Sequence, residues 1–250
     1  MACFSGPADW WTDGTDDGRT HIATKGVVQD GLVLNLDAGV SSSYPGTGTT
    51  WFDLSGLGGN AIAFNNPIFN SEKYFNFDGA NDFFRYERND INSGSFAYTN
   101  ATIQIMVRPS SSGTIGGTTN NLFTIENTVE ISIGNNNNGF SQLQYASNPW
   151  AWKGTTGDVL INDQWNLITY VHATSGRWLY VGDQEVFYSA DNGNLSAGSV
   201  TYPYLTLMGR YDGTGSSAEG DLSFVRIYNR TLTATEIKRN FEATRNRYGI

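Results

Sequence analysis

Residues 220–237, GDLSFVRIYNRTLTATEI, constrain the fold of this chain more than any other segment. Apolar and polar side chains alternate with a period of two through the first half of the segment, which predicts a β-strand. We expect one face of this strand to carry Leu222, Phe224, Arg226 and Tyr228, and the other to carry Ser223, Val225 and Ile227. Thr233 and Glu236 follow with the spacing of a capping box, in which both side chains accept hydrogen bonds from backbone N–H groups at a helix start. The segment therefore predicts a strand that turns directly into a helix.

The same segment resembles the closing motif of laminin-G-like, concanavalin A-like jelly-roll domains, G-x-I-D-E-V-x-I-Y-N-R-x-L-S-x-E-E-I. The matching positions are Gly220, Leu222, Val225, Ile227, Tyr228, Asn229, Arg230, Leu232, Thr233, Glu236 and Ile237. The resemblance implies a two-sheet β-sandwich. One departure matters for metal binding, because Ser223 stands where the motif has an acidic residue.

Other segments resemble the same family in the same order along the chain. The opening loop reads L-D-A-G at residues 36–39, S-Y-P-G at 43–46 and W-F-D-L-S-G at 51–56. Residues 74–86, YFNFDGANDFFRY, resemble the F-x-F-D-G-x-N-D-Y hairpin of the family. Similar patterns recur through residues 165–181 and 205–210, so the resemblance covers most of residues 30–237. We therefore predict an all-β, concanavalin A-like (laminin-G-like) jelly-roll β-sandwich with an N-terminal arm and a short C-terminal helix.

The chain divides into three predicted parts. Residues 31–232 form the sandwich, which begins where Leu32, Leu34 and Leu36 alternate with polar or smaller residues. Residues 1–30 show no sustained period and predict an extended arm. Trp10 and Trp11 in this arm are costly to leave in water, so we expect the arm to dock, either on its own sandwich or on a partner.

Residues 233–250 predict a C-terminal helix and tail. Ile237 and Phe241 lie on one apolar stripe, and Arg245 and Arg247 make the end of the helix basic, which suits a helix C-terminus. Two interpretations stay open: a solvated helix end, or a basic surface that meets an acidic neighbour. The candidate partner-binding residues are Trp10, Trp11, Phe241, Arg245 and Arg247.

Charge and composition exclude several classes of function. The formal net charge is −9 and the pI is about 4.6, which disfavours binding to nucleic acid or to anionic lipid. Cys3 is the one cysteine, so no intrachain disulfide can form. No run of residues has the length of a membrane-spanning helix. Residues 1–18, MACFSGPADWWTDGTDDG, lack the basic start and apolar stretch of a secretory signal, so we expect synthesis in the host cytoplasm without a signal peptide.

Catalytic and metal-binding patterns are weak in this sequence. Glu126 and Glu130 are the nearest approach to the carboxylate pair with which glycosidases of this fold flank a glycosidic bond. No nucleophile elbow or phosphate loop occurs. The family often holds a structural calcium between the opening loop, near Asp53 and Gly58, and the closing strand. Because Ser223 replaces the acidic residue there, we predict no metal, no cofactor and no enzymatic activity.

Aromatic residues supply candidate contacts for a sugar. Trp150 and Trp152 in PWAWK, and Tyr202 and Tyr204 in YPYL, are the candidate glycan-contacting residues. A sugar site needs an aromatic platform with polar partners in one groove. The alternative is that these pairs pack in the core or in an interface. We consider a glycan as a ligand because of the resemblance in fold as much as because of these residues.

Two functional hypotheses follow from the resemblance. Family versions with S-Y-P-G-x-G-x-x-W and a closing R-[YF]-G-[IL], here residues 247–250, resemble proteins of tailed-bacteriophage virions. The first hypothesis is therefore a non-enzymatic structural component of a virion, such as a capsid decoration, head fibre or tail accessory protein. Its partners would be other virion proteins, in several copies per particle, and a host-surface glycan. The alternative is a secreted bacterial carbohydrate-binding module or adhesin.

Overall fold

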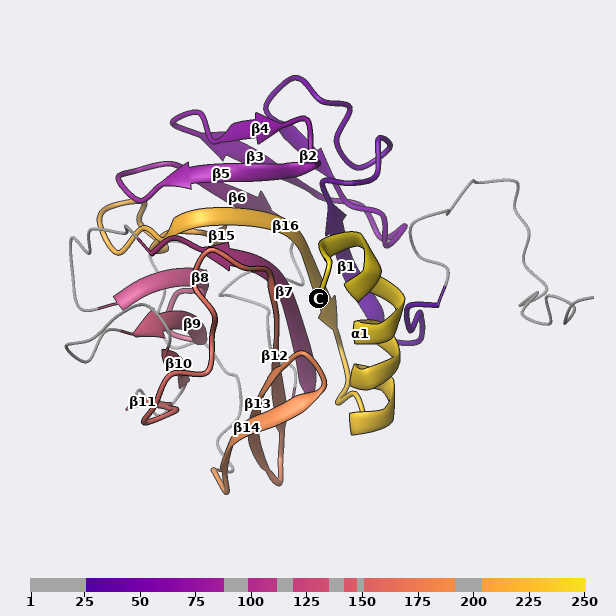
Figure 1. The fold of residues 1–250 in the computed structure, drawn as a ribbon, viewed down its shortest axis with the longest axis vertical. Coiled ribbons are helices and arrows are strands. Elements are labelled where there is room, and N and C mark those ends of the chain that lie inside the picture. The colour runs from indigo at the N-terminus through magenta and orange to yellow at the C-terminus, as the bar shows by residue number, and fades with distance from the viewer. Residues whose placement is uncertain (1–25, 88–98, 112–118, 135–141, 148–150, 192–203) are drawn as a thin grey trace, which may run out of the picture.

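The computed structural model describes residues 26–87, 99–111, 119–134, 142–147, 151–191 and 204–250. In these residues the chain forms two packed antiparallel sheets, followed by a C-terminal helix (Figure 1). This architecture confirms the predicted all-β jelly-roll class. The predicted arm lies almost wholly outside the described residues.

Two eight-stranded sheets make the layers. The first sheet has the order β14-β13-β12-β7-β16-β5-β4, and β1 also pairs with β16. Its strands are β1 (Leu32–Asp37), β4 (Ile68–Asn70), β5 (Tyr74–Asp78), β7 (Ala101–Pro109), β12 (Asn166–Ala173), β13 (Gly176–Val181), β14 (Gln184–Ser189) and β16 (Glu219–Tyr228). The second sheet has the order β11-β10-β9-β8-β15-β6-β3-β2. Its strands are β2 (Thr50–Phe52), β3 (Asn60–Phe64), β6 (Phe83–Glu87), β8 (Thr119–Ile125), β9 (Val129–Gly134), β10 (Gln142–Ser147), β11 (Ala151–Gly154) and β15 (Leu205–Leu207).

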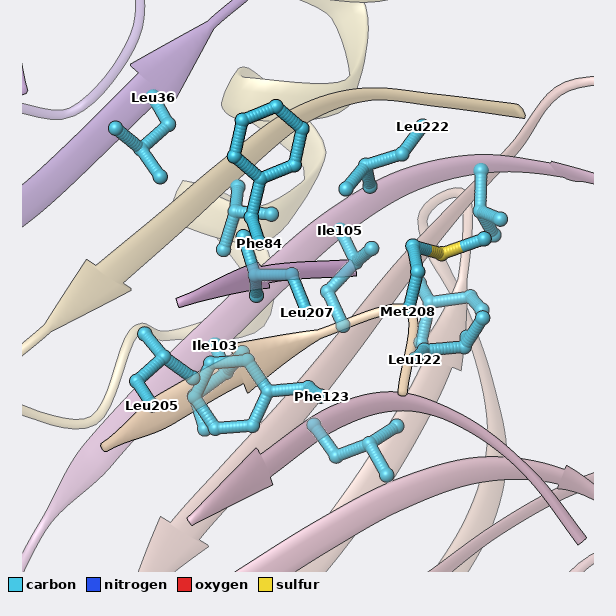
Figure 2. Packing of buried hydrophobic residues seen from close by; sticks show 14 of the residues in the cluster. Leu36, Phe84, Ile103, Ile105, Leu122, Phe123, Leu205, Leu207, Met208 and Leu222 are labelled. Carbon is cyan, nitrogen blue, oxygen red and sulfur yellow. The ribbon is translucent and has the colours of Figure 1, made fainter. Parts of the chain in front are cut away.

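The main hydrophobic core fills the space between the two sheets (Figure 2). Ile103 and Ile105 of the first sheet lie in the same cluster as Phe123 and Leu207 of the second. Trp51 is fully buried in this core, with ring centroids 4.9 Å from Phe75 and 5.2 Å from Phe84. Removing this apolar surface from water is the main favourable term for the sandwich.

The closing strand departs from the predicted alternation at one point. A β-bulge shifts the pairing of β16 with β7, so that Leu222 lies opposite Val107 and Phe224 lies opposite Met106. One extra residue in a strand moves the following side chains to the other face. Leu222 therefore packs in the main core with Val225 and Ile227, and its predicted place beside Phe224 is wrong.

The helix α1 (Ala234–Tyr248) begins directly after the capping-box residue Thr233, as the sequence predicts. Thr233 is the N-cap, and both hydrogen bonds of the capping box with Glu236 are present. Gly249 closes the helix with φ of 70°, a left-handed conformation that favours glycine. The described part of the chain contains no helix with the length and apolar character of a membrane span.

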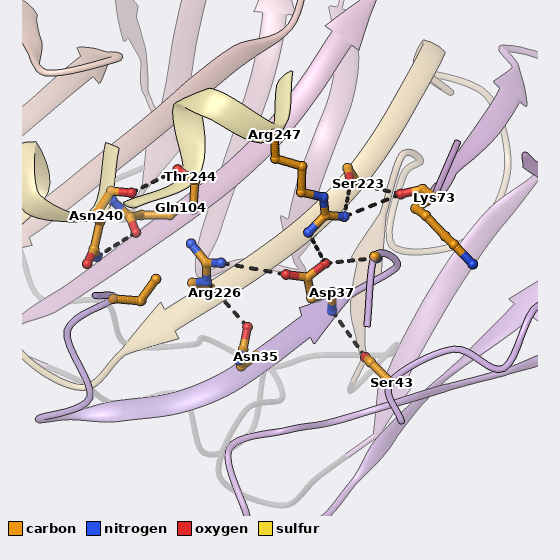
Figure 3. A network of polar contacts seen from close by, with 12 residues as sticks. Asn35, Asp37, Ser43, Lys73, Gln104, Ser223, Arg226, Asn240, Thr244 and Arg247 are labelled. Carbon is orange, nitrogen blue, oxygen red and sulfur yellow. Dashed lines mark hydrogen bonds and ion pairs between the residues drawn. The ribbon is translucent and has the colours of Figure 1, made fainter. Parts of the chain in front are cut away.

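The outer face of the first sheet carries α1, which contacts it through apolar and polar groups. Ile237 packs in a small cluster with Tyr228, and Asn240 Nδ2 donates to Gln104 Oε1 at 2.9 Å and to the Tyr228 hydroxyl at 3.0 Å. Figure 3 shows the contact between Asn240 and Gln104. Gln104 is fully buried although it points away from the main core, because α1 covers it. The first sheet is therefore covered on this face, whereas the described residues contain no such helix over the second sheet.

Candidate functional site

The outer face of the second sheet carries a row of side chains that crosses seven strands. Core residues such as Tyr145, Ile131 and Phe123 point inward, so their neighbours along each strand point outward. The cross-strand partners in the outward row, from β11 to β3, are Trp152, Ala146, Glu130, Thr124, Thr206, Arg85 and Ile62. The middle of this row is closed to solvent, since Thr124 is buried and donates its hydroxyl to the Gly209 carbonyl at 3.1 Å.

An open groove of about 630 Å³ lies at the β11 end of this face. Residues of β10, β11 and the following loop line it: Gln142, Gln144, Trp152, Lys153, Gly154, Thr155, Thr156, Gly157 and Asp158. Trp152 is the one aromatic residue in this lining, and amides, hydroxyls and one carboxylate surround it. This composition is typical of a site for a polar ligand with one flat apolar face.

The pairing of β10 with β11 places the Trp152 indole in the groove. Trp152 lies opposite the small Ala146, and 40% of its surface is exposed. The next residue, Lys153, belongs to the other face of the strand, where its ammonium group contacts the Asp191 carboxylate at 2.5 Å. Because this ion pair joins the edge of the second sheet to the segment after β14, it helps to fix the orientation of β11.

Two glutamines of β10 line the groove, and two glycines lie against one of them, Gln144. A Cβ atom at Gly134 would lie 2.9 Å from Gln144 Cδ, and one at Gly154 would collide with the backbone of Gln144. The missing side chains therefore leave room for the Gln144 amide to lie low on the sheet. Gln142 Nε2 donates to the Thr156 carbonyl at 3.4 Å. The groove thus offers amide donors and acceptors beside an exposed aromatic ring.

Glu130 lies further along the row, beneath the surface. It is 5% exposed, and Asn121 Nδ2 donates to its Oε2 at 3.4 Å. Burial raises the pKa of Glu130 to about 7, although the charge of nearby Arg210 acts in the opposite direction. Glu130 is therefore a group that changes charge near neutral pH.

The candidate carboxylate pair does not lie in the groove. Glu126 is buried at the turn between β8 and β9, and Glu130 is buried on β9. Asp158 is the one carboxylate among the residues that line the groove. A glycosidase needs a second carboxyl group on the other side of the scissile bond. The described lining of the groove therefore does not contain such a pair.

The predicted glycan-contacting residues fall in different places. Trp152 lies in the groove, and Trp150 and Tyr202 lie outside the described residues. Tyr204 lies near the other end of the row, with its ring 5.0 Å from the Arg85 guanidinium. The structure therefore does not place Tyr204 in the groove with Trp152, and whether either contacts a glycan stays a prediction.

The predicted partner-binding residues of the C-terminal helix lie against the sandwich to different degrees. Phe241 packs against the buried cluster of Met106, Leu167 and Phe224 on the outer face of the first sheet, and Arg245 is near Glu242 at 3.6 Å. Arg247 donates to the Asp37 carboxylate at 2.6 Å (Figure 3). Of these three, Arg245 is the most open to a partner, with 41% of its side chain exposed. The other two predicted residues, Trp10 and Trp11, lie outside the described residues.

The residues at the family's calcium position do not fit a cation. Asp53 Oδ1 accepts hydrogen bonds from the Asn35 and Ser55 backbone N–H groups. The Ser223 hydroxyl accepts from the Arg247 guanidinium at 3.0 Å, so a positive charge already contacts it. In the described residues no group of three or more acidic, histidine or cysteine side chains is arranged to hold a metal ion.

Sequence reasoning missed most of the groove. Gln142, Gln144 and Asp158 have no motif around them, and they meet Trp152 only because β10 pairs with β11. The alternation of Leu143 and Tyr145 with Gln142 and Gln144 was a usable signal, since it places both glutamines on one face.

The chain matches the laminin G family model described as the concanavalin A-like lectin/glucanases superfamily, over residues 78–238. The chain therefore belongs to this family. A search of curated protein sequences finds no match.

Several solved structures are similar to this chain. Domain 4 of a GH43 extracellular arabinanase from Geobacillus stearothermophilus, in complex with arabinotriose, has a TM-score of 0.60 and 16% identity, with 83% of this chain and 96% of that domain covered. The botulinum neurotoxin serotype D ligand-binding domain, in complex with N-acetylneuraminic acid, has a TM-score of 0.62 and 14% identity, covering 88% of this chain and 52% of that one. Trypanosoma rangeli sialidase has a TM-score of 0.59 and 16% identity, with 86% and 33% covered. This chain thus spans about half of the neurotoxin domain and a third of the sialidase, and at these identities the likeness shows a shared fold.

Proposed function

We propose that this chain is a non-enzymatic carbohydrate-binding sandwich whose groove around Trp152 contacts a glycan. The observation that carries the proposal is the exposed Trp152 indole in a groove whose other lining is almost entirely polar. A pyranose ring has an apolar face that stacks on an indole, and hydroxyl groups at its edge that pair with amides. Gln142 and Gln144 supply such amides on the same face as Trp152.

Two structurally similar domains support this proposal, since one was solved with arabinotriose and the other with N-acetylneuraminic acid. We assign no catalytic role to the groove. Asp158 lacks a facing carboxyl group in the described lining, whereas glycosidases canonically use two carboxyl groups that flank the scissile bond.

A glycan microarray followed by titration calorimetry tests the proposal. We expect at least one oligosaccharide to bind the wild-type chain, and Trp152→Ala to weaken its affinity by about tenfold or more. Tyr188→Ala is the matched control, because Tyr188 on β14 is 49% exposed but belongs to the other sheet. Equal affinities for wild-type and Trp152→Ala chains would refute the groove as the site. Incubation of the bound oligosaccharide with the chain should release no shorter products.

We further propose that this sandwich belongs to the virion of a tailed bacteriophage, as a capsid decoration, head fibre or tail accessory protein. The support is the sequence pattern of residues 43–51 and 247–250, together with a segment before residue 30 that carries Trp10 and Trp11. In this proposal the N-terminal arm attaches to other virion proteins and the sandwich faces outward. The exposed Arg245 of α1 offers a second contact.

Purified particles of the source organism test the virion proposal. We expect the chain in stoichiometric amounts on the particles. We expect deletion of residues 1–25 to abolish attachment, while the buried Val28, which is hydrogen-bonded to Asn240 and Tyr228, keeps its place in the fold. Particles that lack the chain would favour the alternative, a secreted carbohydrate-binding module or adhesin. Attachment that survives the deletion would show that the arm is not the anchor.

A further inference from the structure

Arg85 lies at the other end of the outward row, held among aromatic rings. Its guanidinium carbon is 5.0 Å from the ring centroids of Phe64, Phe83 and Tyr204. The rings of Phe64 and Phe83 are nearly parallel, at 9°, with centroids 5.0 Å apart. Contact with three rings restricts the orientation of the guanidinium group, and the side chain is half-buried.

The charge on Arg85 has no carboxylate to balance it within the part of the chain that the structure describes. Six other arginines of the described chain each have a carboxylate oxygen within 4 Å: Arg108, Arg210, Arg226, Arg230, Arg245 and Arg247. Among the described residues, no carboxylate lies within that distance of Arg85. In a chain with a net charge of −9, an arginine that is half-buried without an acidic neighbour is unusual and suggests that it binds an anion.

Thr206 adds a second donor beside the guanidinium. It is the direct cross-strand partner of Arg85 on β15. The Thr206 hydroxyl and Arg85 Nε are both buried, and neither has a hydrogen-bond partner within the described chain. Unsatisfied buried polar groups are costly, and most native ones have a partner that is a water, an ion or a ligand.

We propose that Arg85 and Thr206 form a second site on the outer face of the second sheet, which binds the carboxylate of an acidic sugar. Arginine binds a carboxylate through two parallel hydrogen bonds, and the hydroxyl adds a third donor. Ile62, the exposed partner of Arg85 on β3, provides an apolar surface for the body of the sugar ring.

An acidic sugar fits this site better than an acidic peptide. Arg85 and Trp152 share one face of one sheet, five strand spacings or about 24 Å apart. Because the middle of the row between them is closed to solvent, a short oligosaccharide reaches only one of the two sites. The overall negative charge of the chain repels polyanions, so selective binding of an acidic sugar would have to come from a local group.

Matched acidic and neutral ligands test this second site. The first pair is trigalacturonate and its methyl ester, and the second pair is sialyllactose and lactose, so the two arms distinguish uronic from sialic carboxylates. In titration calorimetry we expect the wild-type chain to prefer the acidic member of at least one pair by about tenfold or more. Arg85→Gln should abolish that preference, and Arg85→Lys should reduce it because lysine lacks the planar fork.

Three further variants separate this site from other effects. Arg245→Gln removes one positive charge on the opposite side of the sandwich and should keep the preference. Trp152→Ala should also keep the preference for acidic ligands, so a failure of the second site can be distinguished from a failure of the proposed glycan site around Trp152. If Arg85→Gln unfolds the chain, Thr206→Val provides a second test, because it leaves the ring cluster intact. Thr206→Val should weaken binding of the acidic ligands and leave binding of the neutral ligands unchanged. Equal affinity for both members of both pairs, a preference that survives Arg85→Gln, or selective binding of an acidic peptide in their place would overturn the proposal.

Discussion

Replacing Glu130 by glutamine should stabilise the folded chain at alkaline pH and change little at acidic pH. Glu130 is 5% exposed, and its burial raises its pKa from 4.5 to about 7. Between these values the folded chain binds more protons than the unfolded chain, so stability contributed by this group falls as the pH rises. The pH dependence of stability that Glu130 contributes thus has the opposite sign to that of a carboxylate stabilised by a salt bridge.

The size of the effect follows from the two pKa values. A carboxyl group that must ionise against this environment destabilises the folded state by about 3 kcal/mol above pH 7, as an upper bound. Glutamine has nearly the same volume, cannot ionise and can still pair with Asn121. We therefore expect Glu130→Gln to raise the free energy of unfolding by about 2 to 3 kcal/mol at pH 8 and by close to nothing at pH 4.

Urea unfolding of wild type and variant at pH 4, 6 and 8 measures this difference, provided that the slopes agree. Other groups that titrate in the same range cancel when the two chains are compared at each pH. Glu72→Gln, in the exposed turn after β4, controls for the change in net charge. Loss of stability at pH 8 would refute the argument and show that Arg210 holds Glu130 ionised at a net gain. A difference in stability that does not depend on pH would also refute it.

Three other predictions concern the stability of the sandwich that carries the site. Trp51→Ala removes a fully buried ring that packs on Phe75 and Phe84, and it should lower the free energy of unfolding by about 3 to 5 kcal/mol in a urea titration. Asp37→Asn leaves the fully buried Arg226 without its carboxylate and should cost about 3 to 5 kcal/mol, whereas Asp183→Asn at the exposed pair with Lys238 should change stability little. Because Ser223 contacts the Arg247 guanidinium, EDTA should shift the melting temperature very little, and a fall of several degrees would indicate a stabilising metal ion.

Local patterns in the sequence predicted the closing strand and the start of α1. The spacing of Thr233 and Glu236 is enough to predict the capping box, because both hydrogen bonds form within one helical turn. The bulge near Ser223 was not predictable in this way, since it depends on the register between β16 and β7. Alternation alone therefore placed Leu222 on the wrong face.

The candidate site was predictable only in part. An exposed role for Trp152 was one of two interpretations of PWAWK, and the groove required the pairing of β10 with β11. Arg85 and Thr206 are far apart in the sequence, and β6 brings them together only by pairing with β15. Such contacts depend on the order of strands in the sheet, which no single segment specifies.

A crystal structure with a bound oligosaccharide chosen from the microarray tests the central claim most directly. We predict a sugar ring stacked on the Trp152 indole, with its hydroxyl groups within hydrogen-bond distance of the Gln142 or Gln144 amide. A sugar bound away from this groove, with the Trp152 indole uncovered, would contradict the account.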